Sequence, residues 1–179
     1  MTYRMIYLVG QPGSGKSTLM AELTRPYDLL VREETVPHLG LIDRTTGEVI
    51  GAEIGKRRDS FSGTDALASA IIDKAVPWVS TRPYEMLLAE GARLANARFL
   101  DAAIAAGYDL TVALLDHDQA EEWRLARSRK LKRVQNESWV KGRLSASRNL
   151  ADAMKGKARV LRGHPDQLRQ GLQEIIADG

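Results

Sequence analysis

The sequence predicts a three-layer α/β fold, in which a central parallel sheet of about five strands is flanked by helices. Two observations predict it. Short apolar runs alternate along the chain with segments of helical periodicity, and a glycine-rich turn directly follows the first apolar run. A chain of 179 residues, of which 44% are hydrophobic, is long enough to bury one core, so we expect a single domain over residues 1–179.

The elements are predicted in chain order from their apolar positions. Residues 5–9 predict the first buried strand, and the helix after it is expected to stop before Pro26. Further strands are predicted at residues 28–32, 86–90, 110–115 and 159–161. The positions that predict helices are Leu19, Met20 and Leu23; Leu67, Ile71, Ala75 and Trp78; Leu94, Ala97, Leu100 and Ile104, closed by Gly107; Val140, Leu144, Ser147 and Ala151; and Leu168, Leu172, Ile175 and Ile176.

Residues 36–54 depart from this alternation. They contain two short extended runs on either side of residues 44–47, whose sequence RTTG is typical of a turn. The segment therefore predicts a β-hairpin that is inserted above the sheet.

Residues 10–17, GQPGSGKS, fit the pattern GxxxxGK[ST] and directly follow the first predicted strand. Such a loop cradles phosphates with its backbone N–H groups, and the helix that follows adds its positive N-terminal end. Lys16 is expected to reach the β- and γ-phosphates of ATP, and Ser17 to hold Mg²⁺ through its hydroxyl. The predicted nucleotide-binding residues of this loop are Gly10, Gly13, Ser14, Gly15, Lys16, Ser17 and Thr18.

Acidic residues at the ends of predicted strands are candidates for metal and proton chemistry, because ligands of an open parallel sheet lie at the carboxyl ends of its strands. Glu90 ends the strand at 86–90, where its carboxylate can bind magnesium or its waters. It can instead cap a helix or pair with Arg93. Glu33 follows the strand at 28–32 and either faces the acceptor or lies in an exposed loop.

The segment KRRDSFSGTD, residues 56–65, combines cations, a glycine and an acid just before a predicted helix. Arg57 and Arg58 can contact phosphates of a substrate. Asp65 can accept a proton from an attacking hydroxyl, and it can also cap the helix that follows. Phe61 is either a stacking platform for a base or a core aromatic residue.

Basic residues gather in the second half of the chain. Half of the 26 Lys and Arg residues lie between Arg124 and Arg162, where the acidic residues are Glu137 and Asp152. Such a stretch favours a polyanionic partner, although it can also be the solvated face of a helix. Residues 124–143 predict a helical lid, in which arginines neutralise the transferred phosphoryl group and exclude water.

The composition excludes several classes of protein for this chain. The chain has no cysteine, which excludes disulfides and thiolate metal sites and fits a reducing compartment. No apolar run has the length of a membrane span, and the N-terminus lacks the layout of a secretory signal. A cytoplasmic protein without a membrane partner is therefore expected. The three histidines show no metal-ligand spacing, and we interpret them as structural or solvated.

The phosphate loop, the strand ending in Glu90 and the spacing of Arg124 and Arg127 resemble the P-loop kinases of nucleoside monophosphates, such as adenylate and thymidylate kinases. Other segments are similar to a branch found in bacteriophages, which includes kinases that phosphorylate hydroxymethyluracil already built into DNA as the first step of thymine hypermodification. These segments are GKRRDSFSGTDAL (55–67), EGARLAN (90–96) and WVKGRLSASRNLA (139–151).

The resemblance implies site residues in this chain. It implies phosphate binding by Lys16 and Ser17, and a catalytic or magnesium-linked acid at Asp65 or Glu90. It also implies lid or acceptor contacts by Arg93, Arg124, Arg127 and Arg143. Together with the reasoning from the residues themselves, this gives a complete set of predicted roles. The predicted catalytic residues are Lys16, Asp65, Glu90 and Arg127, and Arg124 is predicted to bind the nucleotide. The predicted substrate-binding residues are Glu33, Arg57, Arg58, Phe61, Arg93 and Arg143.

We therefore expect an ATP- and magnesium-dependent kinase, with the hydroxymethyl group of hydroxymethyluracil in phage DNA as favoured acceptor. Thymidylate kinases carry an Asp-Arg pair near the second phosphate site, where this chain has Glu90-Gly91-Ala92-Arg93. This departure and the basic second half favour DNA over a free nucleotide. The alternatives are a kinase of free nucleosides or nucleotides, and a DNA-stimulated P-loop ATPase without an acceptor.

Overall fold

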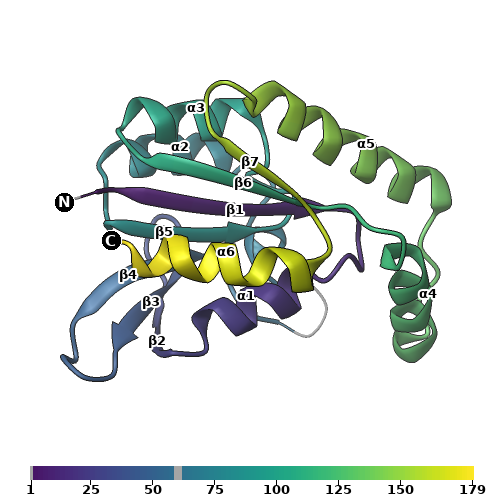
Figure 1. Cartoon of the computed structure of the whole chain (residues 1–179), viewed down its shortest axis with the longest axis horizontal. Coiled ribbons are helices and arrows are strands. Elements are labelled where there is room, and N and C mark those ends of the chain that lie inside the picture. Colours follow the sequence, from purple (N-terminus) through teal and green to yellow (C-terminus); the bar gives the residue numbers. More distant parts are fainter. Residues whose placement is uncertain (1, 59–61) are drawn as a thin grey trace.

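A seven-stranded sheet forms the centre of the computed structural model, which describes residues 2–58 and 62–179. Its strands lie in the order β2-β3-β4-β5-β1-β6-β7 (Figure 1). Their bounds are β1 Arg4–Gly10, β2 Tyr27–Arg32, β3 His38–Asp43, β4 Val49–Ile54, β5 Met86–Glu90, β6 Asp109–Leu115 and β7 Arg159–Gly163.

The strands β4, β5, β1, β6 and β7 run parallel, so the predicted α/β fold with a parallel sheet is confirmed. In the middle of the sheet, Leu8 of β1 lies opposite Glu90 of β5 on one side and Ala113 of β6 on the other. Residues 5–9 are buried on both faces, as is typical of a parallel sheet covered by helices. The carboxyl ends of these strands meet at one edge, and the loops at that edge build the site.

The strand at 28–32 and the hairpin at 36–54 form as predicted, but their predicted places, in the parallel part of the sheet and above the sheet, are wrong. Both segments belong to the sheet: β2 pairs antiparallel with β3, and β3 antiparallel with β4, which joins β5 in parallel. A short apolar run indicates a strand but does not identify its neighbours. Glycine at position 51 of β4 allows the close approach to β5, because a Cβ atom there would lie 2.8 Å from the carbonyl oxygen of Met86.

Helices cover the sheet on both faces and make the outer layers (Figure 1). One face carries α1 Lys16–Thr24 and α6 Pro165–Ala177, whose apolar residues share a buried cluster with Ile6 and Leu8. The other carries α2 Ile72–Ser80, α3 Ala97–Ala105 and α5 Glu137–Met154, around a cluster that contains Met5, Tyr7 and Val9. Successive side chains of β1 point to opposite faces of the sheet, so this strand contributes residues to the buried clusters on both faces.

Two predicted helices begin later than their apolar pattern suggests. Leu67 and Leu94 are buried in the core, but each lies in the loop before its helix. A short 3₁₀ helix, η1 Thr64–Ala66, precedes α2, and Asn96 caps α3 by accepting a hydrogen bond from the N–H of Phe99 at 3.0 Å. Periodicity cannot distinguish a core residue in a loop from one in a helix.

The helix α4 Ala120–Leu131 and the first part of α5 contain residues 124–143. They form a helical hairpin that extends past the carboxyl edge of the sheet, away from the two layers (Figure 1). Lys132 ends α4 in the left-handed conformation with φ 51°, and Asn136 caps α5. Within the described part of the chain, none of the helices combines the length and the apolar composition that a membrane span requires.

Candidate active site

The glycine-rich loop lies between β1 and α1 and is fixed by contacts with two other helices. Gly13 and Gly15 have φ angles of 80° and 100°, which favour glycine. A Cβ atom at Gly13 would lie 2.6 Å from Cα of Arg124, and one at Gly15 would lie 3.2 Å from the indole ring of Trp123. The loop thus packs directly against α4, and larger residues at these positions would separate the two.

Lys16 begins α1 and turns back over the loop. Its Nζ donates hydrogen bonds to the carbonyl oxygens of Gly10, at 3.1 Å, and Gln11, at 2.9 Å. Burial lowers the pKa of the Lys16 ammonium, while the nearby carboxylates of Glu90 and Asp65 oppose this shift. The ammonium therefore lies between the phosphate loop and both predicted acids.

Glu90 ends β5 beside Ser17, with its carboxylate buried. Its Oε1 accepts hydrogen bonds from Ser17 Oγ at 3.0 Å and from Ser62 Oγ at 3.1 Å, and the two hydroxyls are 2.8 Å apart. Burial raises the pKa of Glu90, and the Lys16 ammonium acts in the opposite direction. The hydroxyls of Ser17 and Ser62 and the carboxylate of Glu90 thus form a cluster of oxygen atoms next to the loop. Ser62 was missed by sequence reasoning, since nothing in its local pattern distinguishes it from an ordinary loop serine.

Asp65 is held on the other side of β5. Its Oδ1 accepts a hydrogen bond from the N–H of Ala92 at 2.8 Å, and it caps neither η1 nor α2. The buried hydroxyl of Tyr7 supports this arrangement, because it donates to the carbonyl oxygen of Gly91 at 2.9 Å and lies 3.1 Å from Thr64 Oγ1. Asp65 is therefore fixed to the loop after β5, and its Oδ2 has no hydrogen bond from the residues that the structure describes.

The α4–α5 hairpin brings arginines toward the loop. Arg127 of α4 lines the cavity beside the phosphate loop, and the charges of Arg127 and of Arg143 in α5 both lower the pKa of Lys16. Arg124 is buried and pairs with Glu121, with Nε 2.9 Å from Oε2. Its backbone packs on Gly13, and its contact with the nucleotide stays a prediction.

A cavity of about 380 Å³ lies beside the loop and the start of α1. Trp123 and Pro165 form its apolar walls, and its other lining residues are Gly13, Gly15, Lys16, Ser17, Thr18, Leu19, Glu22, Arg127, Asp166 and Arg169. The Trp123 ring packs on His117 and His164, with centroids 4.7 and 5.1 Å away. Sequence reasoning missed Trp123 and Pro165; a tryptophan one turn before Arg127 was the available signal.

The family comparison agrees with this geometry. The model of the P-loop Nucleotide Kinase3 family matches residues 1–177. The chain belongs to this P-loop nucleotide kinase family. No curated protein matches the chain.

In this P-loop nucleotide kinase, the histidines have structural partners. Nε2 of His117 lies 2.9 Å from the carbonyl oxygen of Ser14, and His164 caps α6 as part of a capping box with Gln167. Ser14 Oγ itself is buried without a hydrogen-bond partner among the described residues, which leaves a polar atom of the loop unsatisfied. Among residues 2–58 and 62–179, no three His, Asp or Glu side chains gather as a metal cluster.

The predicted substrate-binding residues do not all meet at the loop. Glu33, Arg57 and Arg58 line a second cavity of about 400 Å³, whose apolar part is formed by Leu29, Val31 and Leu39. Two ion pairs fix its rim, Lys56 with Glu33 at 2.8 Å and Arg57 with Glu53 at 2.8 Å.

Two other members of the predicted set have separate positions. Nε of Arg93 donates a hydrogen bond to the carbonyl oxygen of Leu67 at 3.2 Å, so Arg93 is tied to the loop before α2 rather than to Glu90. Phe61 lies outside the described residues.

Proposed function

We propose that this P-loop nucleotide kinase transfers the γ-phosphoryl group of ATP, in the presence of magnesium, to the hydroxymethyl group of hydroxymethyluracil in DNA, as in the bacteriophage branch that it resembles. The observation that carries the proposal is the meeting of Lys16, Ser17, Glu90 and Asp65 at one edge of the sheet. Family membership makes phosphoryl transfer the reaction that such a site performs.

The nucleotide end of the site is supported by the fit of the loop to a triphosphate. The loop N–H groups and the N-terminus of α1 offer donors to the phosphates. Lys16 would exchange its bonds with Gly10 and Gln11 for the β- and γ-phosphates, because a carbonyl oxygen is a weaker partner for an ammonium than a phosphate. The cavity walls of Trp123 and Pro165 would then enclose the adenine ring.

The magnesium ion would be held by Ser17 and by Glu90, directly or through water. Both offer the hard oxygen atoms that Mg²⁺ prefers, and one or two carboxylates are typical of such sites. When bound, the ion neutralises charge on the β- and γ-phosphates. Glu90 would then exchange the hydrogen bonds of Ser17 and Ser62 for a cationic partner, which relieves the cost of its buried charge.

The geometry favours different roles for the two acids. Glu90 bonds to Ser17 and so belongs to the metal side, whereas Asp65 makes no bond to Ser17 and retains Oδ2 for a substrate. In the proposed step, the acceptor oxygen forms a bond to the γ-phosphorus while the bond to ADP breaks, and the hydroxyl proton passes to Asp65. Arg127 and Arg143 would stabilise the charge on the transferred group.

The sequence after β5 supports a DNA acceptor. Thymidylate kinases use an Asp-Arg pair at the second phosphate site; here Glu90 is followed by Gly91, and Arg93 is bonded to the backbone of Leu67. A free monophosphate would therefore lack that clamp. A target base in DNA would have to leave the stack, and the polymer backbone can supply the affinity that a small acceptor cannot.

The test is a labelling experiment with γ-labelled ATP and three acceptors: DNA that contains hydroxymethyluracil, ordinary DNA, and free nucleotides. We expect label only in the modified DNA, and none with Lys16→Ala. Label confined to a free nucleotide would assign a small-molecule kinase, which the family name equally permits. Release of free phosphate, stimulated by DNA and without a labelled acceptor, would assign an ATPase.

A further inference from the structure

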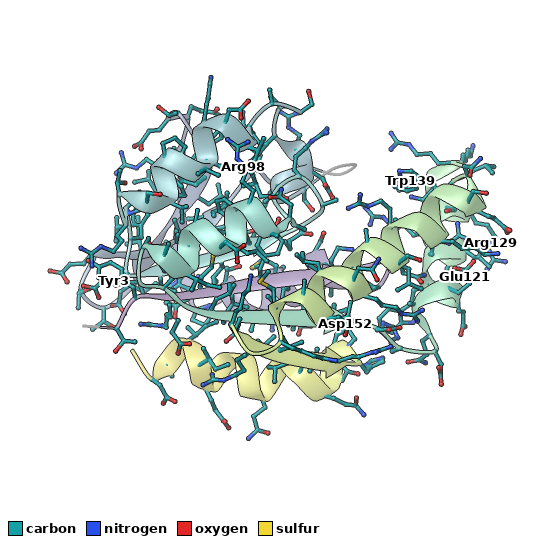
Figure 2. All side chains as sticks on the ribbon, turned by 90° about the horizontal axis from the view of Figure 1, so that it is seen from above. Tyr3, Arg98, Glu121, Arg129, Trp139 and Asp152 are labelled. Carbon is teal, nitrogen blue, oxygen red and sulfur yellow. The ribbon has the colours of Figure 1, made fainter. Side chains whose placement is uncertain are left out.

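The outer end of the α4–α5 hairpin is a surface that the proposed chemistry does not use. We call it the lid tip and define it by Arg129, Lys130, Leu131, Lys132, Val134 and Trp139. Figure 2 shows Arg129 of α4 and Trp139 of α5 on the part of the molecule that lies beyond the sheet and its helical layers. The inner end of α4, with Trp123 and Arg127, instead borders the phosphate loop.

The cations of the lid tip differ from the paired basic residues on the body of the molecule. Toward the sheet, Arg148 and Arg162 pair with Asp116, Lys155 with Asp152, and Lys157 with Asp101. Arg129, Lys130 and Lys132 take part in none of the ion pairs found among the described residues. Several cations of the body are thus neutralised by ion pairs, whereas those of the lid tip, like Arg127, Lys141, Arg143 and Arg159, take part in none among the described residues.

Apolar side chains lie among these cations without cover. Val134 is 100% exposed, Trp139 51% and Leu131 40%. Tryptophan is normally buried in large part, so a half-exposed indole at the start of the helix that follows the basic end of α4 indicates a contact surface.

The mixture of charges and rings favours a nucleic acid over a membrane. A helix that lies on a membrane gathers its apolar residues on one face. In α4 they are distributed around the helix, with Trp123, Leu125 and Leu131 separated by cations. Proteins that bind single strands combine cations along the backbone with an aromatic platform for the bases, and the lid tip has both.

We propose that the lid tip binds a single-stranded segment of DNA next to the target base, with Lys130 and Lys132 on the phosphates and Trp139 stacked on a base. The inference rests on the proposed function, because a DNA acceptor must be gripped outside the pocket that holds its reactive group. A strand on the tip would lie on the same hairpin that carries Arg127 to the cavity beside the phosphate loop.

The test compares binding of an unmodified single-stranded oligonucleotide, measured without ATP, among three variants. Trp139→Ala should weaken binding about 5- to 100-fold, as expected for the loss of one stacked base. The double variant Lys130→Ala/Lys132→Ala should reduce the slope of log affinity against log salt by about 1.4, since each lost phosphate contact removes about 0.7. The matched control Lys155→Ala/Lys157→Ala removes the same charge from residues already paired with Asp152 and Asp101.

The outcomes separate this inference from the proposed function. Equal binding by the wild type, Trp139→Ala and the tip double variant would overturn the lid-tip proposal, whatever the labelling experiment shows. A loss in the control as large as that in the tip variant would also overturn it, since net charge alone would then explain binding. Tip variants that bind DNA normally but lose binding to vesicles containing phosphatidylserine would assign a membrane surface. If the tip binds DNA while only a free nucleotide is labelled, the proposed acceptor is wrong and the binding surface stands.

Discussion

Replacing Glu90 by Gln should stabilise the nucleotide-free protein while removing most of the stabilisation that MgATP provides. The carboxylate is 2% exposed, and burial raises its pKa. A raised pKa means that the folded chain binds more protons than the unfolded chain above the ordinary pKa of Glu, about 4.3. The free energy of unfolding therefore falls as the pH rises through the interval up to the raised pKa. Gln has no such titration, so the variant should gain stability at neutral pH and lose that advantage below about pH 4.

The effect on the nucleotide complex follows from binding linkage. Loss of a residue that supports a metal typically lowers the affinity for the metal about 10- to 100-fold. At an MgATP concentration of 100 times the wild-type Kd, binding stabilises the wild type by about 2.7 kcal/mol, and a 100-fold weaker variant by about 0.4 kcal/mol. A difference of about 2.3 kcal/mol corresponds to about 5–9 °C in Tm for a chain of 179 residues.

Thermal unfolding with and without MgATP, repeated over a series of pH values, measures both effects. Glu53→Gln is the matched control, because Glu53 is also buried at the end of a strand with its pKa raised by burial, but it pairs with Arg57 rather than Ser17. We expect the control to retain the MgATP shift. If Glu90→Gln keeps the full shift, Glu90 does not support the metal. If it is less stable than the wild type at pH 7, the reasoning from its buried charge is wrong.

Three further substitutions test other parts of the site. Trp123→Ala should weaken ATP binding by about 1–3 kcal/mol in calorimetry and leave inorganic tripolyphosphate binding nearly unchanged; an equal loss for both ligands would place the base elsewhere. Gly13→Ala should lower the free energy of unfolding by at least about 1–2 kcal/mol, because of its left-handed backbone and its contact with α4; unchanged denaturation would refute that packing. Tyr7→Phe should lower the free energy of unfolding by about 1–3 kcal/mol in chemical denaturation, since it leaves the carbonyl oxygen of Gly91 without this donor. It should also lower kcat, because the loop that carries Asp65 loses its contact with the hydroxyl. A variant with wild-type stability and kcat would contradict the role of this hydroxyl.

Local patterns were sufficient to predict the phosphate loop and the order of most elements. The loop is contiguous, and its glycines, Lys16 and Ser17 have roles set by their spacing. The strand at 86–90 was predicted from its short apolar run, which the structure shows to be buried, and its end placed Glu90 at the carboxyl edge. The position of Asp65 was harder to predict, since its sequence context suited a helix cap equally well. The structure brings it to the loop after β5 through the N–H of Ala92.

Pairings between distant segments could not be predicted from such patterns. Residues 28–32 form a strand as expected, but its place at the antiparallel edge depends on β3 and β4. The apolar walls of the cavity beside the loop, Trp123 and Pro165, lie more than forty positions apart in the printed sequence and meet only because β6 and β7 are neighbours. Likewise, counting basic residues could not separate the paired cations of the body from those of the lid tip.

The sequence by itself determined the contacts that form within a few residues: the strand, the glycine-rich turn and the helix after it, whose geometry follows from backbone sterics and spacing. Only the tertiary structure decided which carboxylate lies against Ser17, which is fixed to the neighbouring loop, and which arginine lines the cavity together with Lys16. These distances depend on how strands and helices far apart in the chain pack together. Packing is a property of complementary surfaces and is not encoded in any single local segment.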